Sequence, residues 1–155
     1  MRHRPAPKRE IIPDPKYANV TLAKFINYVM RDGKKNTAQT VVYDALDIIS
    51  EKAKTDPLAL FDLAVKNITP AVEVKSKRVG GANYQIPMQV RGERRLALAF
   101  RWLIAAAEGK KGRPMAQKLA EELMAAANNE GEAVKKKMDV HRMAEANRAF
   151  AHFAR

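Results

Sequence analysis

A segment near the middle of the chain, residues 72–95, holds many of the side chains that could do recognisable chemistry. It reads VEVKSKRVGGANYQIPMQVRGERR and carries six basic side chains against two acidic ones. Lysine and arginine at this density neutralise phosphates and release bound counterions, and arginine also grips phosphate or stacks on a base. The segment therefore predicts a surface that binds a polyanion, with nucleic acid as the obvious candidate. Its basic residues are Lys75, Lys77, Arg78, Arg91, Arg94 and Arg95.

The chain has few of the residues that catalysis or metal binding requires. The chain has no cysteine, and its serines, Ser50 and Ser76, lie outside any nucleophile-elbow or phosphate-loop glycine pattern. Its histidines are His3, His141 and His152, and no cluster of further ligands accompanies them. We therefore expect a protein that is not an enzyme, with no catalytic residue, metal ion, cofactor or small-molecule substrate.

Two aromatic residues could belong either to the binding surface or to the protein interior. Tyr84 lies near the tip of the basic segment. There it could stack on an unpaired base, a contact worth about 1–3 kcal/mol, or pack across the segment, and both interpretations stay open. Trp102 fits the interior better than a stacking role.

The basic segment has the pattern of two short β-strands. Val72 and Val74 alternate with charged residues, and residues 85–88 lead back after the glycines. We expect a turn of more than two residues at Gly80–Asn83, and an exposed edge strand at Pro87, which has no N–H to donate. Because an isolated two-stranded hairpin is marginally stable, this one must project from a larger body.

The remainder of the chain predicts helices, each with one apolar side. Apolar residues recur at helical spacing from Val20 until Asp32-Gly33 interrupts them, and a second such pattern follows. Asp56-Pro57 is a start signal for a third helix. Further helices are expected at residues 93–108, from 114 onward and at 133–150. The predicted fold is mostly α, a single domain of about six helices with a protruding basic β-hairpin between the third and fourth.

Cationic residues on two of these helices should gather on one side. On the fourth helix the basic residues lie opposite the apolar stripe, provided that its first turn includes Arg91. On the last helix, three polar residues project in nearly the same direction. The two sets are Arg91, Arg94, Arg95 and Arg101, then Lys137, His141 and Arg148.

Charge is distributed unevenly along the chain. The formal net charge is +12, yet residues 17–70 are nearly neutral. Residues 1–16 are rich in proline and arginine, which predicts an extended basic arm. Residues 17–155 then form one helical RNA-binding domain that includes the hairpin at 72–91. No membrane-span or signal-peptide pattern is visible, so we expect a cytoplasmic protein that does not bind membranes.

The combination of a basic arm, turn, ribbon and helix faces bears on which nucleic acid is bound. It favours a folded RNA, which is recognised through shape, phosphates and unstacked bases, over a single helix in a DNA groove. The alternative is an architectural DNA-binding protein that places its basic β-arm in the minor groove.

Four stretches also carry a family resemblance in collinear order. They are KREIIPDPKYANVTLAKFINYVMRDGKK (8–35), VEVKSKRVGGANYQIPMQVR (72–91), ALAFRWLI (97–104) and AVKKKMDVHRMAEANRAFAHF (133–153). They resemble the bacterial-type ribosomal protein seven of the small subunit. The resemblance implies a helical domain with a protruding hairpin. It also implies direct, early binding to small-subunit ribosomal RNA, and a role in organising the 3′ domain that becomes the subunit head.

The resemblance further implies neighbours and contact residues. It suggests a position in the small subunit near the subunit interface, with the hairpin beside the exit-site tRNA and the messenger RNA. It suggests contact with ribosomal proteins nine and eleven of the same subunit. The implied RNA contacts are Lys8, Arg9, Lys34, Lys35, Lys75, Lys77, Arg78, Tyr84, Arg94, Arg95, Arg101, Met115, Lys136, His141 and Arg142. Arg91, Lys137 and Arg148, from the helix faces above, complete the predicted RNA-binding set.

Overall fold

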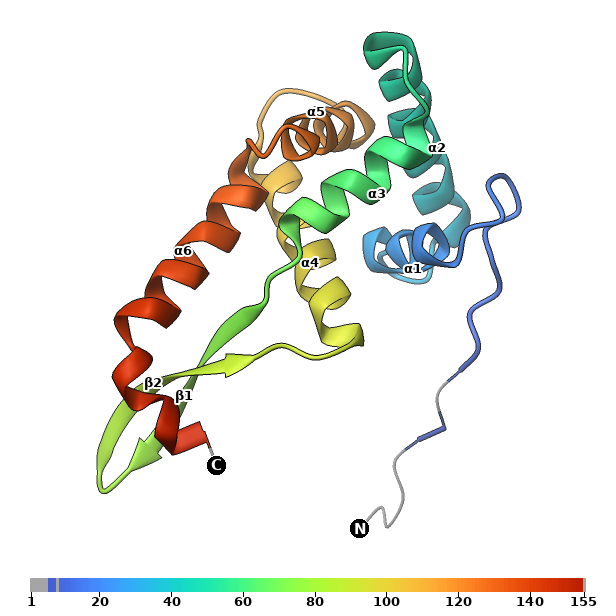
Figure 1. The fold of residues 1–155 in the computed structure, drawn as a ribbon. Helices are drawn as coiled ribbons and strands as arrows, with labels where there is room; N and C mark the ends of the chain where they lie inside the picture. The colour runs from blue at the N-terminus through green and yellow to red at the C-terminus, as the bar shows by residue number, and fades with distance from the viewer. Residues whose placement is uncertain (1–5, 8, 155) are drawn as a thin grey trace.

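The computed structural model describes residues 6–7 and 9–154, and within them the chain is mostly helical (Figure 1). An antiparallel hairpin lies between the third and fourth helices, which confirms the predicted fold class. The elements are α1 (Val20–Val29), α2 (Lys35–Ala53), α3 (Pro57–Ile68), β1 (Val72–Val79), β2 (Ala82–Gln89), α4 (Glu93–Gly109), α5 (Met115–Ala127), α6 (Glu132–Ala146) and the 3₁₀ helix η1 (Arg148–Ala154).

The core lies between the first five helices, because each of them buries one apolar side. Phe25 of α1 stands at its centre, with its ring 5.4 Å from Phe61 of α3 and 5.3 Å from Phe100 of α4. Trp102 packs against this core, half-buried, as expected. The tilted aromatic contacts fix how α1, α3 and α4 cross, so the side chains on their outer faces are held on a rigid frame.

Two helices begin where the sequence signals predict. The Asn19 side chain accepts hydrogen bonds from the backbone N–H groups of Thr21 and Leu22, at 2.7 and 3.0 Å, and so caps α1. Asp56 caps α3 in the same way through Leu58, at 3.0 Å, with proline in the first helical position.

A third helix is capped by a residue distant in sequence. Glu122 of α5 is buried, and its Oε1 accepts a hydrogen bond from the backbone N–H of Ala133 in the first turn of α6, at 2.9 Å. Its Oε2 accepts no hydrogen bond of acceptable angle, but it lies 2.9 Å from the Lys110 ammonium. Glu122 therefore joins α5 to the start of α6 and to the loop after α4.

The hairpin is tighter than expected. Val79 pairs with Ala82, so the turn consists of Gly80 and Gly81 alone, and the prediction of a longer turn is wrong. Both glycines have positive φ, 58° and 91°, which glycine adopts without strain and which a two-residue hairpin turn of this kind requires. Pro87 pairs with Val74 in this two-stranded sheet, where both strands are edges, as predicted for a residue without N–H.

Two helix boundaries differ from the predicted ones. Gly92 has φ 46°, so α4 begins at Glu93, and the grouping of Arg91 with its first turn is wrong. The predicted helix at 133–150 ends at Ala146 instead. There the Asn147 side chain donates to the carbonyl of Met143, at 2.8 Å, and competes with the helical pattern. Arg148 consequently lies on η1, not on the α6 face.

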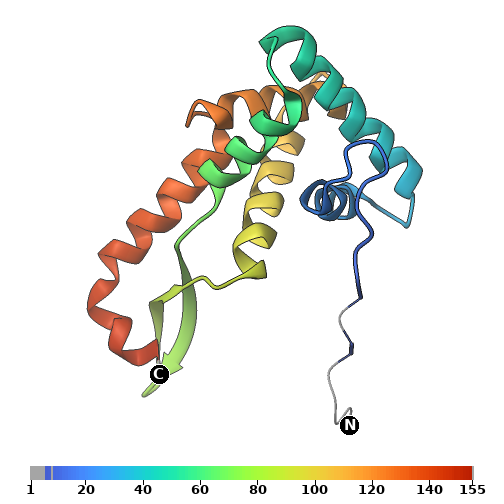
Figure 2. The ribbon, with the colours of Figure 1, turned by 45° about the vertical axis from the view of Figure 1, so that its right-hand side comes forward.

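The basic segments leave the helical body on the same side. In both views the hairpin, with α6 and η1 beside it, and the N-terminal segment extend in the same direction, with the start of α4 between them (Figures 1 and 2). No described helix is both long and apolar enough to cross a membrane.

The N-terminal segment is attached to the helical body at Asp14, shortly before α1 begins. Asp14 is buried and accepts hydrogen bonds from the backbone of Lys16 and Tyr17, both at 3.1 Å, and from the Tyr43 hydroxyl at 2.6 Å. Burial and this hydrogen bond to Asp14 raise the pKa of Tyr43 to about 12. The described residues before Asp14 have no regular structure, so Asp14 is the point at which this segment becomes anchored.

Candidate nucleic-acid interface

One face of the hairpin is covered by the C-terminal segment. Because side chains alternate along a strand, Lys77 shares a face with its partner Tyr84. The Tyr84 ring lies 5.1 Å from Phe150 and 5.4 Å from Phe153 of η1, and the Lys77 ammonium donates to the Phe153 carbonyl at 3.0 Å. Tyr84 is therefore half-buried against η1.

Arg78 lies on the other face of the hairpin. It is exposed and pairs with Asn83 beside the glycine turn. Within the described part of the chain it makes no hydrogen bond or ion pair, in contrast to Lys77 and to Lys75, which lies 3.5 Å from Glu73. Arg78 therefore lies in solvent with no group of the described chain holding its guanidinium.

An ion pair joins the hairpin to α4, with the Glu73 carboxylate buried and the Arg94 side chain about half exposed. The Arg94 guanidinium donates three hydrogen bonds of 2.8–3.0 Å to the carboxylate of Glu73. These bonds lower the pKa of Glu73, although its burial works in the opposite direction. The next residue, Arg95, donates to the carbonyl of Val90 at 2.7 Å. Both arginines thus hold the base of the hairpin, and like Arg91 they remain exposed to solvent.

The α6 helix also holds the base of the hairpin in place, on the β1 side. The backbone N–H of Ala71 donates to Nε2 of His141 at 3.3 Å, and the Lys137 ammonium donates to the carbonyl of Asn67 at 2.7 Å. Burial, reinforced by the nearby Lys137 charge, lowers the pKa of His141, so the ring favours the neutral form that can accept this hydrogen bond. His141 and Lys137 are therefore engaged with the connection between α3 and β1.

Other cations of α6 and η1 are exposed beside the hairpin. Arg142 pairs with Asp139 at 2.7 Å and Arg148 pairs with Glu145 at 3.4 Å, one turn apart in each case, and Lys136 is exposed. A hollow of about 680 Å³ between α6, η1 and β2 is lined by His141, Arg142 and Arg148. We define the hairpin surface as Lys75, Lys77, Arg78, Tyr84, His141, Arg142 and Arg148.

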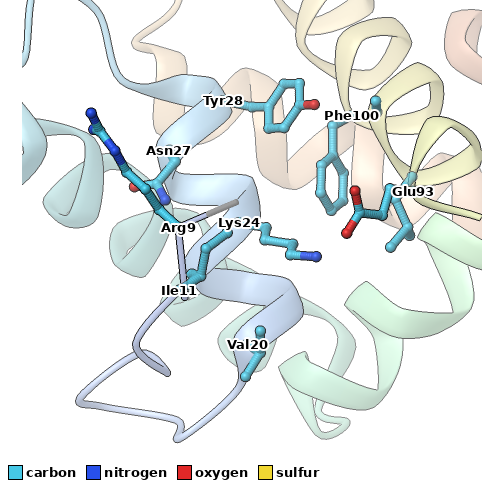
Figure 3. A pocket seen from close by; sticks show the side chains of 10 residues that line it. Arg9, Ile11, Val20, Lys24, Asn27, Tyr28, Glu93 and Phe100 are labelled. Carbon is cyan, nitrogen blue, oxygen red and sulfur yellow. The ribbon is translucent and has the colours of Figure 1, made fainter. Parts of the chain in front are cut away.

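A second basic surface lies on the helical body, along α1 and α4. A groove of about 440 Å³ between these helices is lined by Arg9, Lys24 and Tyr28 (Figure 3). Tyr28 also lines a hollow of about 190 Å³ with Arg31 and Arg101, and Arg31 forms an ion pair there with Glu108.

A third hollow extends this surface to the start of α5. It measures about 470 Å³ and is lined by Arg31, Lys34, Met115 and Lys118. Because neighbouring hollows share Tyr28 or Arg31, the three are continuous. We define the body surface as Arg9, Lys24, Tyr28, Arg31, Lys34, Arg101, Met115 and Lys118.

The structure thus divides the predicted contact residues between two surfaces. It brings Arg9, Lys34, Arg101 and Met115 together on the body, although they come from four distant segments. Lys35, Arg91 and Lys136 are exposed but line neither set of hollows, and Lys8 lies outside the described residues.

Four residues of the body surface were missing from the prediction. They are Lys24, Tyr28, Arg31 and Lys118. Lys24 and Tyr28 follow helical spacing on the side of α1 away from its buried residues, a signal that the sequence did contain, and Arg31 follows just after the helix ends. Lys118 gave no such signal, because its place depends on how α5 packs.

The geometry defines a class of protein before any comparison is made. Its arginines and lysines come from a fixed frame and line wide, open surfaces, and no three metal-ligating side chains gather within the described residues. Such surfaces suit a structural protein that binds a large, folded polyanion through many contacts.

Comparison with known proteins identifies the family. The model of the family described as "Ribosomal protein S7p/S5e" matches residues 1–148. The chain is 61% identical over 153 residues to "Small ribosomal subunit protein uS7" of Thermotoga neapolitana, covering 99% of both chains. It is 58% identical over 152 residues to the protein of that name from Methylocella silvestris, covering 98% of this chain and 97% of the relative. The chain therefore belongs to the ribosomal protein S7p/S5e family.

This result confirms the predicted membership in the bacterial-type family of small-subunit ribosomal protein seven. Members are structural ribosomal proteins, so the chain is not an enzyme. Membership in a ribosomal protein family favours RNA over architectural DNA binding, the two possibilities that the residues left open.

Proposed function

We propose that the protein is a component of the small ribosomal subunit that binds its ribosomal RNA directly, through the body surface and the hairpin surface. The observation that carries this proposal is the convergence of cations from the arm, α1, the turn before α2, α4 and α5 into one continuous body surface. Glu93 and Glu108 also line these hollows, and Glu108 forms an ion pair with Arg31, but the other cations there form no ion pair within the described residues. Like charges placed side by side repel one another. A polyanion removes that repulsion.

The proposed mechanism is the joining of RNA helices around a rigid protein frame. RNA helices repel each other through their phosphates, and each lysine or arginine that neutralises a phosphate also releases counterions. The aromatic core fixes the distance and angle between the two surfaces. Bound early, such a frame would lower the cost of folding the 3′ domain of the RNA and so nucleate assembly of the subunit head.

We propose that the contact set predicted from the sequence binds RNA partly through these two surfaces and partly from positions outside them, with roles divided by geometry. Exposed cations such as Arg78, Arg91 and Lys35 contact phosphates directly. Four side chains orient the hairpin and contact RNA only through the polar atoms that do not bond to the protein: Arg94, Arg95, Lys137 and His141. Lys8 and Arg9 contact RNA from the arm of residues 1–16, and residues 17–155 form the RNA-binding domain.

We also propose that the hairpin extends past the RNA of the subunit head toward the tRNA and messenger RNA that the ribosome binds. It projects from the body with η1 along one face and Arg78 exposed on the other. This shape supports a position near the subunit interface, beside the exit-site tRNA and the messenger path. The family resemblance further supports ribosomal proteins nine and eleven as neighbours.

Reconstitution of the 3′ domain tests the proposed function. Small-subunit ribosomal RNA is assembled with the other proteins of the subunit, with or without this chain, and the accessibility of the head nucleotides is probed chemically. We expect the head to stay open without this chain, and largely open with Lys24→Ala/Lys34→Ala. A matched pair of exposed lysines outside both surfaces, Lys52→Ala/Lys66→Ala, should assemble normally. Equal folding of the head without the protein would contradict the proposal.

A further inference from the structure

The groove between α1 and α4 has an apolar wall that no part of the described chain covers. Val20 is 43% exposed and Tyr28 is 39% exposed, so both present apolar surface to solvent in this groove. The groove volume of about 440 Å³ lies within the range of small-molecule sites and exceeds what one nucleobase requires. Figure 3 shows side chains of both helices directed toward this space, with Ile11 of the arm at its edge.

The aromatic ring in this groove is held rigidly. Tyr28 makes an edge-to-face contact with Phe100, with ring centroids 5.5 Å apart and planes at 64°. Phe100 is itself buried and packed against Phe25 at 5.3 Å, so the Tyr28 ring is anchored through the core while part of it remains in solvent. A ring fixed in this way loses little conformational entropy when another flat group stacks on it.

The charges around the ring match the backbone of a nucleotide on either side of a base. Lys24 and Arg9 line the groove on one side of Tyr28, and Arg101 lines the adjoining hollow on the other side. The groove also holds one carboxylate, Glu93, which has interactions of its own, and within the described residues neither Lys24 nor Arg9 forms an ion pair. The half-buried Asn27 amide on the groove wall offers both a donor and an acceptor to the edge of a base.

We propose that this groove receives one unstacked nucleobase of the ribosomal RNA, which stacks on Tyr28 while Lys24 and Arg101 hold the flanking phosphates. The inference rests on the proposed RNA-binding function and adds a base-specific site to it. An unpaired base stacked on an aromatic ring is how proteins commonly read single-stranded positions in RNA. A neighbouring protein would need an apolar side chain here, but the cations on both sides favour RNA.

Substitutions of Tyr28 separate stacking from charge. Tyr28→Leu keeps the apolar bulk and loses the aromatic face, so affinity for the 3′ domain RNA should fall by about 5- to 150-fold. The slope of log affinity against log salt should not change, because no phosphate contact is removed. Tyr28→Phe should bind like the original chain. Lys24→Ala should reduce the slope by about 0.7–0.9. Leu63→Ala, an exposed apolar residue outside the groove, serves as the control.

The outcomes distinguish this inference from the proposed function. If the original chain shows no salt-dependent binding to the RNA, the proposed function itself fails. If it binds and Tyr28→Leu binds equally well, or if Tyr28→Phe is as weak as Tyr28→Leu, the base site is wrong while RNA binding stands. A benzophenone side chain placed at Val20 in reconstituted subunits should cross-link to a ribosomal nucleotide. Cross-linking only to a protein would show that a protein segment fills the groove.

Discussion

Arg78 gives a sharp test of how the hairpin surface binds RNA. Its guanidinium has no partner within the described chain, whereas Lys77 donates to Phe153 at 3.0 Å and Lys75 lies 3.5 Å from Glu73. A cation already engaged by the protein must give up that contact before it can grip a phosphate fully. We therefore predict that Arg78→Ala weakens binding to the 3′ domain of small-subunit RNA more than Lys77→Ala does.

The size of the effect follows from counterion release. One phosphate contact contributes about 0.9 to the slope of log affinity against log salt for a duplex, and about 0.7 for a single strand. Between 1 M salt, where this contribution vanishes, and 0.1 M salt, one contact is therefore worth about a 5- to 8-fold change in affinity. Arg78→Ala should lose that factor at 0.1 M salt and reduce the slope by about 0.7–0.9.

Fluorescence anisotropy with the labelled RNA at several salt concentrations measures both quantities. Lys52→Ala removes one positive charge from an exposed site outside both surfaces, so it controls for net charge. Circular dichroism checks that the helical content is unchanged. If Arg78→Ala binds like the original chain, or if Lys52→Ala loses as much affinity, Arg78 makes no specific phosphate contact and the reasoning is refuted.

Three further predictions concern the groups that hold the surfaces in place. Glu73→Gln should lower the melting temperature at neutral pH because it weakens the bond to Arg94. Since the pKa of Glu73 is lowered from 4.5, the difference in melting temperature between the variant and the original chain should shrink as pH falls below that value. A difference that persists in acid would contradict this prediction. Burial lowers the pKa of His141 from 6.5, so below pH 6.5 the unfolded chain takes up a proton that the folded chain does not. The original chain should therefore lose stability in thermal melts as pH falls below 6.5, and His141→Gln should lack this loss. Glu122→Ala should lower the free energy of unfolding by about 1–3 kcal/mol in urea, because a buried helix cap is lost. Glu130→Ala, at an exposed position, should change that free energy little. Equal effects of the two substitutions would show that the cap is unimportant.

Local signals predicted the helical elements and the hairpin, because each depends on a few neighbouring residues. The spacing of Leu22, Phe25 and Ile26 shows one face of a helix without any knowledge of its partners. Asp56-Pro57 and the two hairpin glycines act through their own backbone preferences. The errors were of the same local kind: a turn closed by two glycines, and a helix that Asn147 interrupts with its own side chain.

The site could be predicted only in part, because contacts between distant segments decide it. The sequence shows that Arg94 is basic, but not that Glu73 on the neighbouring strand binds its guanidinium. It likewise gives no sign that Tyr84 packs on η1, since that contact depends on where α6 ends. The continuity of the body surface follows from how the helices cross, and no short pattern records that angle.

Direct binding to the 3′ domain of small-subunit ribosomal RNA, with duplex DNA as competitor, tests the central claim most directly. If the two surfaces neutralise about six to eight phosphates, log affinity should fall with log salt with a slope of magnitude about 4–7, and DNA should compete poorly. Equal affinity for the DNA, or binding that hardly depends on salt, would contradict the account.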